Sequence, residues 1–272
     1  MRRSAPRASP GEGSAMIPIE GLSEIASDYD GMLIDQFGVL HDGSKLYPGA
    51  LDVLAKLHGL KIPVAVMTNS GKRTIANTAR LTRMGIPREF YVDAVSSGEV
   101  AYQRLKSSQS RRAFIIGKDG DDYGFDRFEI VSHPQQADVI LILGSNAPAT
   151  PLDEYALMLK GLTVPAICCN PDKLMITPAG LEPAPGAIAA LYEAQGGKVE
   201  WIGKPHRAIY DHALKIIGRP RRALCIGDSA EHDVAGGRGA GLSTLLVTTG
   251  VSEDQTQFDP EPDYLMERFT WR

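Results

Sequence analysis

Short apolar runs that lead into polar or acidic residues constrain the fold of this chain more than any other feature. Four of them are residues 31–36 (GMLIDQ), 63–68 (PVAVMT), 222–226 (RALCI) and 243–247 (STLLV). Buried parallel strands read as continuous apolar runs because helices cover both faces of their sheet. Segments with helical spacing stand between these runs, at 47–60, 72–84 and 231–240, so the sequence predicts an α/β fold with a doubly wound parallel sheet.

A second α/β pattern interrupts the first. It has apolar runs at 112–116, 128–131, 138–143 and 164–169, and helical spacing at 98–106, 152–161 and 186–195. An inserted domain of this kind is suited to act as a lid over the active edge of the first. We therefore predict a disordered tail at 1–15, a core at 16–89 and 201–272, and an inserted cap at 90–200.

The polar residues that follow the core strands indicate a site at one sheet edge. Ligands of open α/β sheets bind outside the carboxyl ends of the strands, so Asp35, Thr68, Asn69 and Asp228 are expected to converge there. A carboxylate at the end of a buried strand is costly unless it is compensated, and Mg²⁺ prefers oxygen ligands of this type. Asp228 and Asp233 have a second interpretation, in which they only cap the helix that begins near Ser229.

Two further segments offer groups that bind anions. Thr68, Asn69 and Ser70 supply hydroxyls and backbone N–H groups at a helix start, although plain N-capping uses the same residue types. Lys204 stands between Gly203 and Pro205, which predicts a lysine held in a turn where it could neutralise a phosphate. The alternative is an ordinary solvated loop lysine.

Composition excludes several classes of protein. The formal net charge of −4 provides no field that would attract nucleic acid. No apolar run reaches the ~18 residues of a membrane span, and the first 15 residues lack the apolar stretch of a secretory signal. Three cysteines without zinc-site spacing fit buried thiols in a reducing cytoplasm, the location that we expect.

Four separated segments resemble, in order, the four motifs of the haloacid dehalogenase (HAD) superfamily. They are residues 32–43 (MLIDQFGVLHDG), 66–70 (VMTNS), 203–205 (GKP) and 227–233 (GDSAEHD). The number of residues between the second and third motifs is similar to that in superfamily members whose cap, of the C2 type, is inserted at this point. Residues 170–172 (NPD) and 185–188 (PGAI) are similar to the class IIA subgroup, the NagD-like and 4-nitrophenylphosphatase-like phosphatases.

The resemblance implies a role for each motif residue. Asp35 would be the nucleophile that forms an aspartyl-phosphate, and Thr68 and Lys204 would grip the phosphoryl oxygens. Asp228 would ligate Mg²⁺, and Asp233 would support that site. The resemblance further implies a small-molecule phosphate ester as substrate and a homodimer formed through the cap, with no nucleic-acid or membrane partner.

One position departs from the family. Phosphatases of this type carry a second Asp two residues after the nucleophile, and this chain has Phe37 there. The backbone carbonyl of Phe37 would still serve as a metal ligand, but the proton donor for the leaving oxygen is lost. General acid catalysis contributes about 10²–10⁴-fold. Either another group such as His41 or Asp42 substitutes as the acid, or the leaving group needs no acid, or the enzyme is slow.

Two alternatives remain open at this point. Asp35-Gln36-Phe37-Gly38 is also similar to the Asp-x-Tyr-Gly motif of haloacid dehalogenases, which displace halide without a metal ion. Loss of the acid would also fit a protein that binds phosphorylated ligands without turnover. The substrate is not readable from the cap, and sugar phosphates, nucleotides and pyridoxal phosphate all remain candidates.

Overall fold

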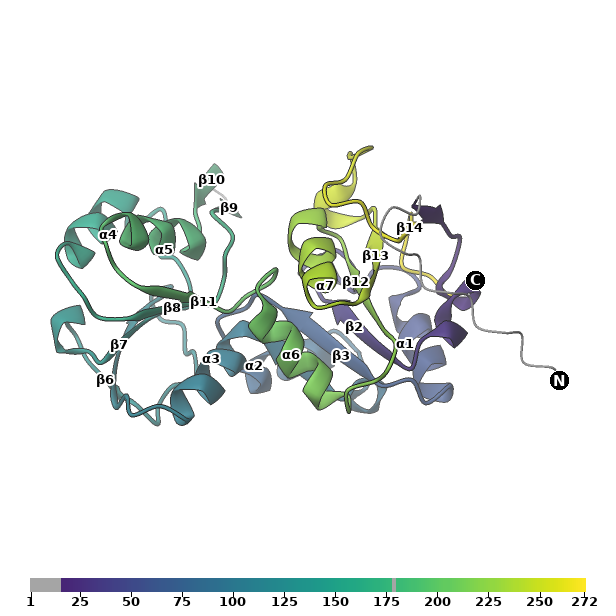
Figure 1. Cartoon of the computed structure of the whole chain (residues 1–272), viewed down its shortest axis with the longest axis horizontal. Coiled ribbons are helices and arrows are strands. Elements are labelled where there is room, and N and C mark those ends of the chain that lie inside the picture. The colour runs from purple at the N-terminus through teal and green to yellow at the C-terminus, as the bar shows by residue number, and fades with distance from the viewer. Residues whose placement is uncertain (1–15, 178–179) are drawn as a thin grey trace. The chain divides into compact units, whose positions relative to one another are not determined.

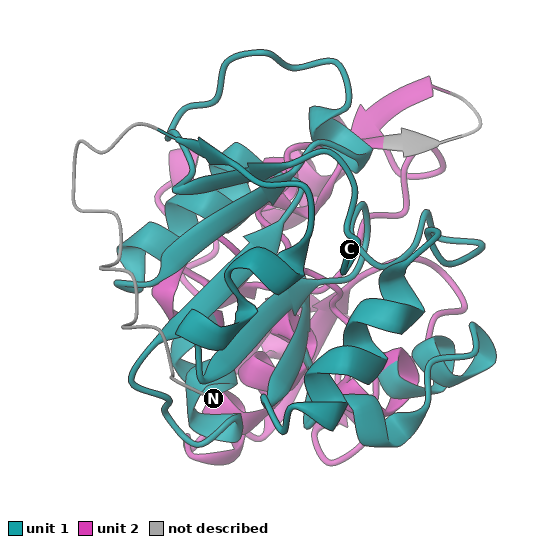
Figure 2. Cartoon of the chain, turned by 90° about the vertical axis from the view of Figure 1, so that its right-hand side faces the viewer, with its two compact units in different colours: residues 1–68, 78–95, 210–272 teal, residues 69–77, 96–209 magenta. Residues whose placement is uncertain are grey.

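The computed structural model describes the backbone of residues 16–177 and 180–272, and the predicted tail at 1–15 lies outside that part. The chain divides into two compact units, which Figure 2 shows in separate colours. The first unit consists of residues 1–68, 78–95 and 210–272, and the second of residues 69–77 and 96–209. Residues 69–77, which the sequence analysis placed in the core, belong to the second unit. The division into a core and a cap stays a prediction.

The first unit is built on a seven-stranded sheet with the order β1-β14-β13-β12-β2-β3-β4. The strands are β1 (Ile17–Pro18), β2 (Gly31–Asp35), β3 (Val64–Thr68), β4 (Asp93–Ser96), β12 (Ala223–Gly227), β13 (Ser243–Val247) and β14 (Tyr264–Met266). Neighbours β12 and β2 run parallel, as do β2 and β3. The chain proceeds outward in one direction from β2 and in the other from β12, so the order reverses between these two strands (Figure 1). Such a switch point is where open α/β sheets bind ligands.

Alternate side chains of the central strands pack on opposite faces of this sheet. Met32 and Ile34 of β2 belong to one buried cluster with Val53 and Leu57 of α1 (Ala50–Gly59). On the other face, a Cβ at Gly31 would contact Ile217, just after α6 (Arg207–Ile216). The remaining helices of the core pattern are α2 (Thr74–Arg83) and α7 (Ala235–Gly239), with short turns η1 (Leu22–Glu24), η2 (Ala26–Asp28), η3 (Arg88–Phe90) and η6 (Gly250–Ser252). The doubly wound α/β fold is therefore confirmed.

The second unit contains its own five-stranded sheet with the order β11-β8-β7-β5-β6. Its strands are β5 (Arg112–Ile116), β6 (Glu129–Ile130), β7 (Val139–Ile142), β8 (Ala166–Cys168) and β11 (Val199–Trp201), and a separate hairpin joins β9 (Leu174–Thr177) to β10 (Gly180–Pro183). The helices are α3 (Ser97–Lys106), α4 (Leu152–Leu159), α5 (Pro185–Ala194) and the short turn η4 (Pro134–Gln136). One face of this sheet packs on Tyr155 and Leu159 of α4 and on Ile188 of α5.

The predicted helix over 231–240 differs in its first turn. Residues Ala230–Val234 form a π-helical turn, η5, before α7 begins. The Val234 N–H donates to the Ser229 carbonyl five residues back at 3.1 Å, and the Ser229 hydroxyl accepts from the His232 N–H. π-helical turns are rare in proteins, and many of those that do occur lie at functional sites.

Candidate metal centre and active site

Three carboxylates meet at the switch point of the first unit. Asp35 ends β2, Asp228 follows β12 directly, and Asp233 lies in η5. One carboxylate oxygen of each lies within 4.8 Å of the others, and the residues are only 7%, 4% and 3% exposed. The parallel register pairs Ile34 with Ile226, which brings the ends of β2 and β12 to the same level. Asp35, Asp228 and Asp233 therefore lie together at the carboxyl edge of the sheet.

The donor set of this cluster fits a hard divalent cation. Like charges buried this close repel one another, so a cation or bound protons must compensate them. All three donors are carboxylate oxygens, without imidazole or thiolate. Mg²⁺ is bound in this way, through a few carboxylates with water and substrate oxygens in the other positions, whereas zinc sites use nitrogen and sulfur ligands.

Asp233 also stabilises the turn that carries Asp228. Its Oδ2 accepts a hydrogen bond from the Ser229 N–H at 3.2 Å. A Cβ atom at Gly227 would overlap the Asp233 carboxyl group, so only glycine fits at the end of β12. The wide turn η5 thus places a carboxylate directly against the strand end.

A loop that the sequence analysis did not single out holds Asp228 in place. The Val251 N–H donates to Asp228 Oδ2 at 2.9 Å, and the Ser252 hydroxyl donates to the Asp228 carbonyl. The Thr249 hydroxyl donates to the Gly38 carbonyl and so ties this loop to the segment after Asp35. The signal was available, because Thr248 and Thr249 follow the apolar run 243–247 just as the other site residues follow theirs.

Phe37 presents its ring to the surface of the first unit. The residue is 54% exposed and lies edge-on to the His41 ring, with 6.1 Å between ring centroids. A Cβ at Gly43 would lie 3.1 Å from the Phe37 ring. The position at which the family resemblance implies a carboxylate thus carries an accessible apolar side chain.

The two candidates for a substitute acid have unfavourable protonation states. His41 is fully buried, its Nδ1 accepts from the Gly43 N–H at 3.1 Å, and burial followed by the charge of Arg80 lowers its pKa. Asp42 accepts hydrogen bonds from the Lys45 N–H and from Ser44, which lower its pKa to about 2. Near neutral pH His41 is therefore uncharged and Asp42 is ionised, which argues against either as the acid.

The remaining predicted site residues divide between the two units. Thr68 ends β3 beside Asp35, because Asp35 pairs with Met67 across the parallel ladder. Asn69, Ser70 and Lys204 belong to the second unit. Their approach to the carboxylates stays a prediction.

Within the second unit, Asn69 and Lys204 form a local clamp. The Lys204 N–H donates to Asn69 Oδ1 at 2.6 Å, and the Asn69 amide donates to the Lys204 carbonyl at 3.1 Å. Lys204 is only 4% exposed. Its backbone is fixed by the Asn69 amide, which comes from a distant segment of the chain. Ser70 accepts from the Gly98 N–H through its carbonyl and from the Lys72 N–H through its hydroxyl. Asn69 therefore positions the lysine, a function that the sequence analysis did not assign to it.

Comparisons with known protein families and curated relatives match most of the chain. Residues 32–131 match a family described as haloacid dehalogenase-like hydrolase, and residues 201–271 match one described as HAD-hydrolase-like. A dihydroxyacetone phosphatase of Corynebacterium glutamicum is 28% identical over 82% of this chain and 82% of its own length. A 5'-nucleotidase of Bacillus subtilis, YutF, is 26% identical over 85% of this chain and 91% of its own length.

Solved structures of hydrolases and phosphatases are also similar to most of the chain. A haloacid dehalogenase-like hydrolase from Brucella suis matches with a TM-score of 0.79 and 25% identity over 92% of this chain and 99% of its own. A p-nitrophenyl phosphatase from Archaeoglobus fulgidus matches with a TM-score of 0.74 and 25% identity, over 88% and 96%. NagD from Escherichia coli, at 23% identity and a TM-score of 0.68 over 88% and 96%, shares the fold. No helix among the described residues is long and apolar enough to span a bilayer.

The loop at 249–252 leads to a prediction about metal affinity. Thr249→Val removes the hydroxyl that holds the Gly38 carbonyl, so the segment after Asp35 is less fixed. A neutral hydrogen bond contributes about 0.5–1.5 kcal/mol, and we expect Mn²⁺, used as a probe for Mg²⁺, to bind about fivefold more weakly by calorimetric titration. Thr249→Ser keeps the hydroxyl and should retain native affinity; equal affinities of the Val and Ser variants would contradict this role.

His41 leads to a prediction about pH. Because the folded protein holds the pKa of His41 below its usual 6.5, the unfolded chain takes up a proton first as the pH falls. The free energy of unfolding should therefore decrease as the pH falls below about 6.5, and this decrease should be smaller in His41→Asn. Urea unfolding at pH 7.5 and 5.5 measures this change in the free energy of unfolding. The substitution His58→Asn is the control, because His58 is exposed. The same pH dependence in all three proteins would show that His41 does not contribute.

Proposed function

We propose that the chain, which belongs to the haloacid dehalogenase-like hydrolases, is a Mg²⁺-dependent phosphatase that hydrolyses a small phosphorylated metabolite through an aspartyl-phosphate at Asp35. Two relatives that are similar to more than four fifths of this chain are named as a phosphatase and a nucleotidase, and both names denote hydrolysis of phosphoric monoesters. The single observation that carries the proposal is the buried cluster of Asp35, Asp228 and Asp233 at the switch point of the sheet. A protein that only binds phosphate esters would not need a nucleophile at position 35.

The first chemical step uses the Asp35 carboxylate. One of its oxygens attacks phosphorus, a P–O bond to Asp35 forms, and the bond to the ester oxygen breaks with its electron pair leaving on that oxygen. A water molecule then attacks phosphorus, releases inorganic phosphate and regenerates the carboxylate. Burial of Asp35 restricts competing water around the nucleophile.

Charge neutralisation supports both steps. Asp35, the Phe37 carbonyl and Asp228 would hold Mg²⁺, which when bound neutralises the nucleophile and the phosphoryl oxygens. Asp233 maintains the turn that carries Asp228 through its bond to the Ser229 N–H. Thr68, Asn69, Ser70 and Lys204 would bind the phosphoryl group, and the clamp between Asn69 and Lys204 supports that role by fixing the backbone of the lysine.

Phe37 determines which leaving groups react well. Its side chain has no proton to give, and neither His41 nor Asp42 holds a transferable proton in a suitable state near neutral pH. An ester oxygen that leaves without a proton must be stable as an anion, as in aryl and acyl phosphates. The exposed ring also offers an apolar contact to an aromatic substrate.

The broader assignments rest on the composition and on the subgroup that the chain resembles. We propose a small phosphate ester as substrate, a homodimer formed through the second unit, and a cytoplasmic location. Cys168, Cys169 and Cys225 are buried thiols that form no disulfide bond, which suits a reducing compartment.

The role of Asp35 is tested by Asp35→Asn. An amide cannot attack phosphorus, so phosphate release from 4-nitrophenyl phosphate should fall by more than about a thousandfold. Asp52→Asn, an exposed aspartate in the first turn of α1, is the matched control and should retain activity. If native protein and Asp35→Asn bind phosphate esters equally and neither releases phosphate, with or without Mg²⁺, the chain is a binding protein.

The role of Phe37 is tested by restoring the acid. Native protein should hydrolyse 4-nitrophenyl phosphate much faster than an alkyl phosphate such as glycerol phosphate. Phe37→Asp should raise kcat/KM for the alkyl ester by about a hundredfold and for the aryl ester far less. Phe37→Leu removes the ring without adding an acid and serves as the control. Equal native rates on both esters would mean that another group already donates the proton.

A further inference from the structure

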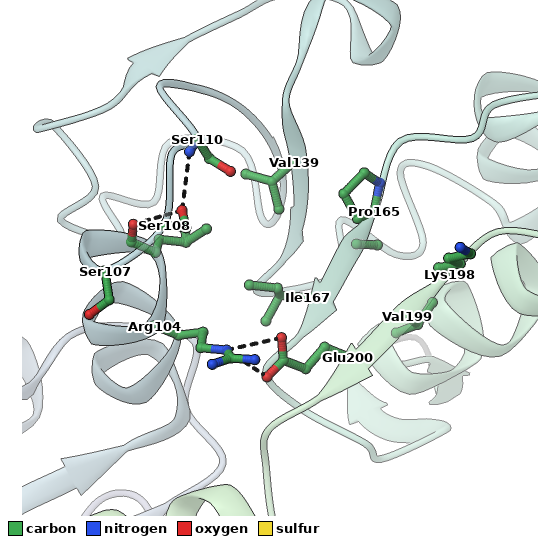
Figure 3. Close-up of a pocket in the computed structure, with 12 residues that line it drawn as sticks. Arg104, Ser107, Ser108, Ser110, Val139, Pro165, Ile167, Lys198, Val199 and Glu200 are labelled. Atoms are coloured by element: carbon green, nitrogen blue, oxygen red, sulfur yellow. Dashed lines mark hydrogen bonds and ion pairs between the residues drawn. The ribbon is translucent and has the colours of Figure 1, made fainter.

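A groove lies on the second unit at the amino ends of strands β7, β8 and β11 (Figure 3). Its volume of about 540 Å³ falls within the range of small-molecule sites. Its lining comes from the end of α3, the loop that follows it and these three strands, and includes Arg104, Leu105, Val139, Ile167, Lys198 and Glu200. All of these residues belong to one unit, and none belongs to the phosphatase site described above.

The groove combines an apolar floor with cationic groups at its rim. Leu105, Val139 and Ile167 are buried hydrophobic residues of the floor. Arg104 and Lys198 are the cations of the lining and Glu200 is its one anion, so the groove carries a local positive charge on a chain whose net charge is −4. This combination suits a small organic anion with an apolar body.

Arg104 is held in a way that leaves donors for a ligand. Its Nε approaches both oxygens of Glu200, at 3.1 and 3.4 Å. The terminal nitrogens of Arg104 and the ammonium of Lys198 make no hydrogen bond or ion pair with the described residues. The side chains of Arg104 and Glu200 are 66% and 43% exposed, and pairs this exposed contribute little, so an anion can compete with Glu200 for the guanidinium.

The end of α3 opposes an anion only weakly. A helix carries a partial negative charge of roughly half a unit at its C-terminus, which is small beside two full cations. The Ser107 and Ser108 hydroxyls also donate to the carbonyls of Gln103 and Leu105, so these carbonyls have hydrogen-bond partners.

Both elements that carry the central ion pair lead to Lys204. Glu200 is in β11, and the chain continues from this strand through Gly203 to Lys204. Arg104 is in α3, whose first residue Ser97 lies 3.5 Å from Asn69 Oδ1 through its hydroxyl. Asn69 in turn makes two hydrogen bonds with the Lys204 backbone. A ligand that separates Arg104 from Glu200 therefore acts on the two elements that position the lysine.

We propose that this groove is a regulatory site for a small organic anion, which displaces Glu200 from Arg104 and alters the position of Lys204 through β11 and α3. The binding part stands on the groove alone, and only the regulatory part rests on the proposed phosphatase function. The apolar body of the ligand would contact Val139 and Ile167, and its anionic group would be bound by Arg104, while Lys198 adds positive charge at another part of the lining.

Binding is tested with 1-anilinonaphthalene-8-sulfonate and with N-phenyl-1-naphthylamine, which has the same rings without the sulfonate. The sulfonate should bind the full-length protein at one saturable site, measured by fluorescence. Arg104→Gln should weaken it about tenfold, the effect of one charge-assisted hydrogen bond. Glu200→Gln should strengthen it, and the uncharged amine should respond to neither change.

Lys160→Gln is the matched control, because Lys160 is exposed at the end of α4, against the other face of this sheet. Circular dichroism and thermal midpoints establish that each variant is folded. Equal binding of both dyes, or identical affinity in Arg104→Gln and native protein, would overturn the site. A change in sedimentation of the Arg104 and Glu200 variants without a change in dye binding would instead identify the groove as an interface between copies.

Regulation has a separate measurement. With the sulfonate dye at saturation, KM for 4-nitrophenyl phosphate should change about fivefold in native protein and not in Arg104→Gln. Binding without any effect on KM or kcat would overturn the regulatory part. If the protein hydrolyses no phosphate ester at all, the proposed function fails, and the dye titrations still decide whether the anion site exists.

Discussion

The repulsion among three buried carboxylates is the constraint on which the first unit depends. Asp35, Asp228 and Asp233 are brought together by the parallel pairing of β2 with β12, and such an arrangement is unfavourable until a cation or protons compensate it. The surrounding structure meets this cost with donors. Backbone N–H groups of Ser229 and Val251 point at the carboxylates, and the glycines at 38 and 250 allow the backbone to approach Asp228 where a Cβ would collide with it.

Much of this arrangement could be read from the order of residues, for a physical reason. A strand buried on both faces must be apolar along its length, so the point where polarity returns marks the carboxyl edge of the sheet. Residues 31–36, 63–68, 222–226 and 243–247 correspond within one or two residues to β2, β3, β12 and β13. The convergence of Asp35 with Asp228 follows from that reading, because parallel neighbours end at the same edge.

The features that escaped prediction depend on contacts between distant segments. Strand β1, at the sheet edge, and its neighbour β14 have only two and three residues, which is too short for an apolar run to stand out in the sequence. The clamp between Asn69 and Lys204 joins residues 135 positions apart, and nothing local distinguishes it from helix capping. The hydrogen bond from Thr249 to Gly38 spans 211 positions. Thr248 and Thr249 nevertheless follow an apolar run directly, which is the pattern that identified Asp35 and Asp228 in the sequence.

The π-helical turn at Ala230–Val234 has weaker backbone hydrogen bonding than an α-helix, but it places the Asp233 carboxylate beside those of Asp35 and Asp228. An ordinary α-helix there would have better backbone hydrogen bonds, and deleting one residue would permit it. Each residue of a helix turns the next side chain by roughly 100°, since a turn takes 3.6 residues. A shortened chain would therefore fold with a more regular helix while Asp233 pointed away from Asp35 and Asp228, so selection for thermal resistance alone would tend to separate the three carboxylates.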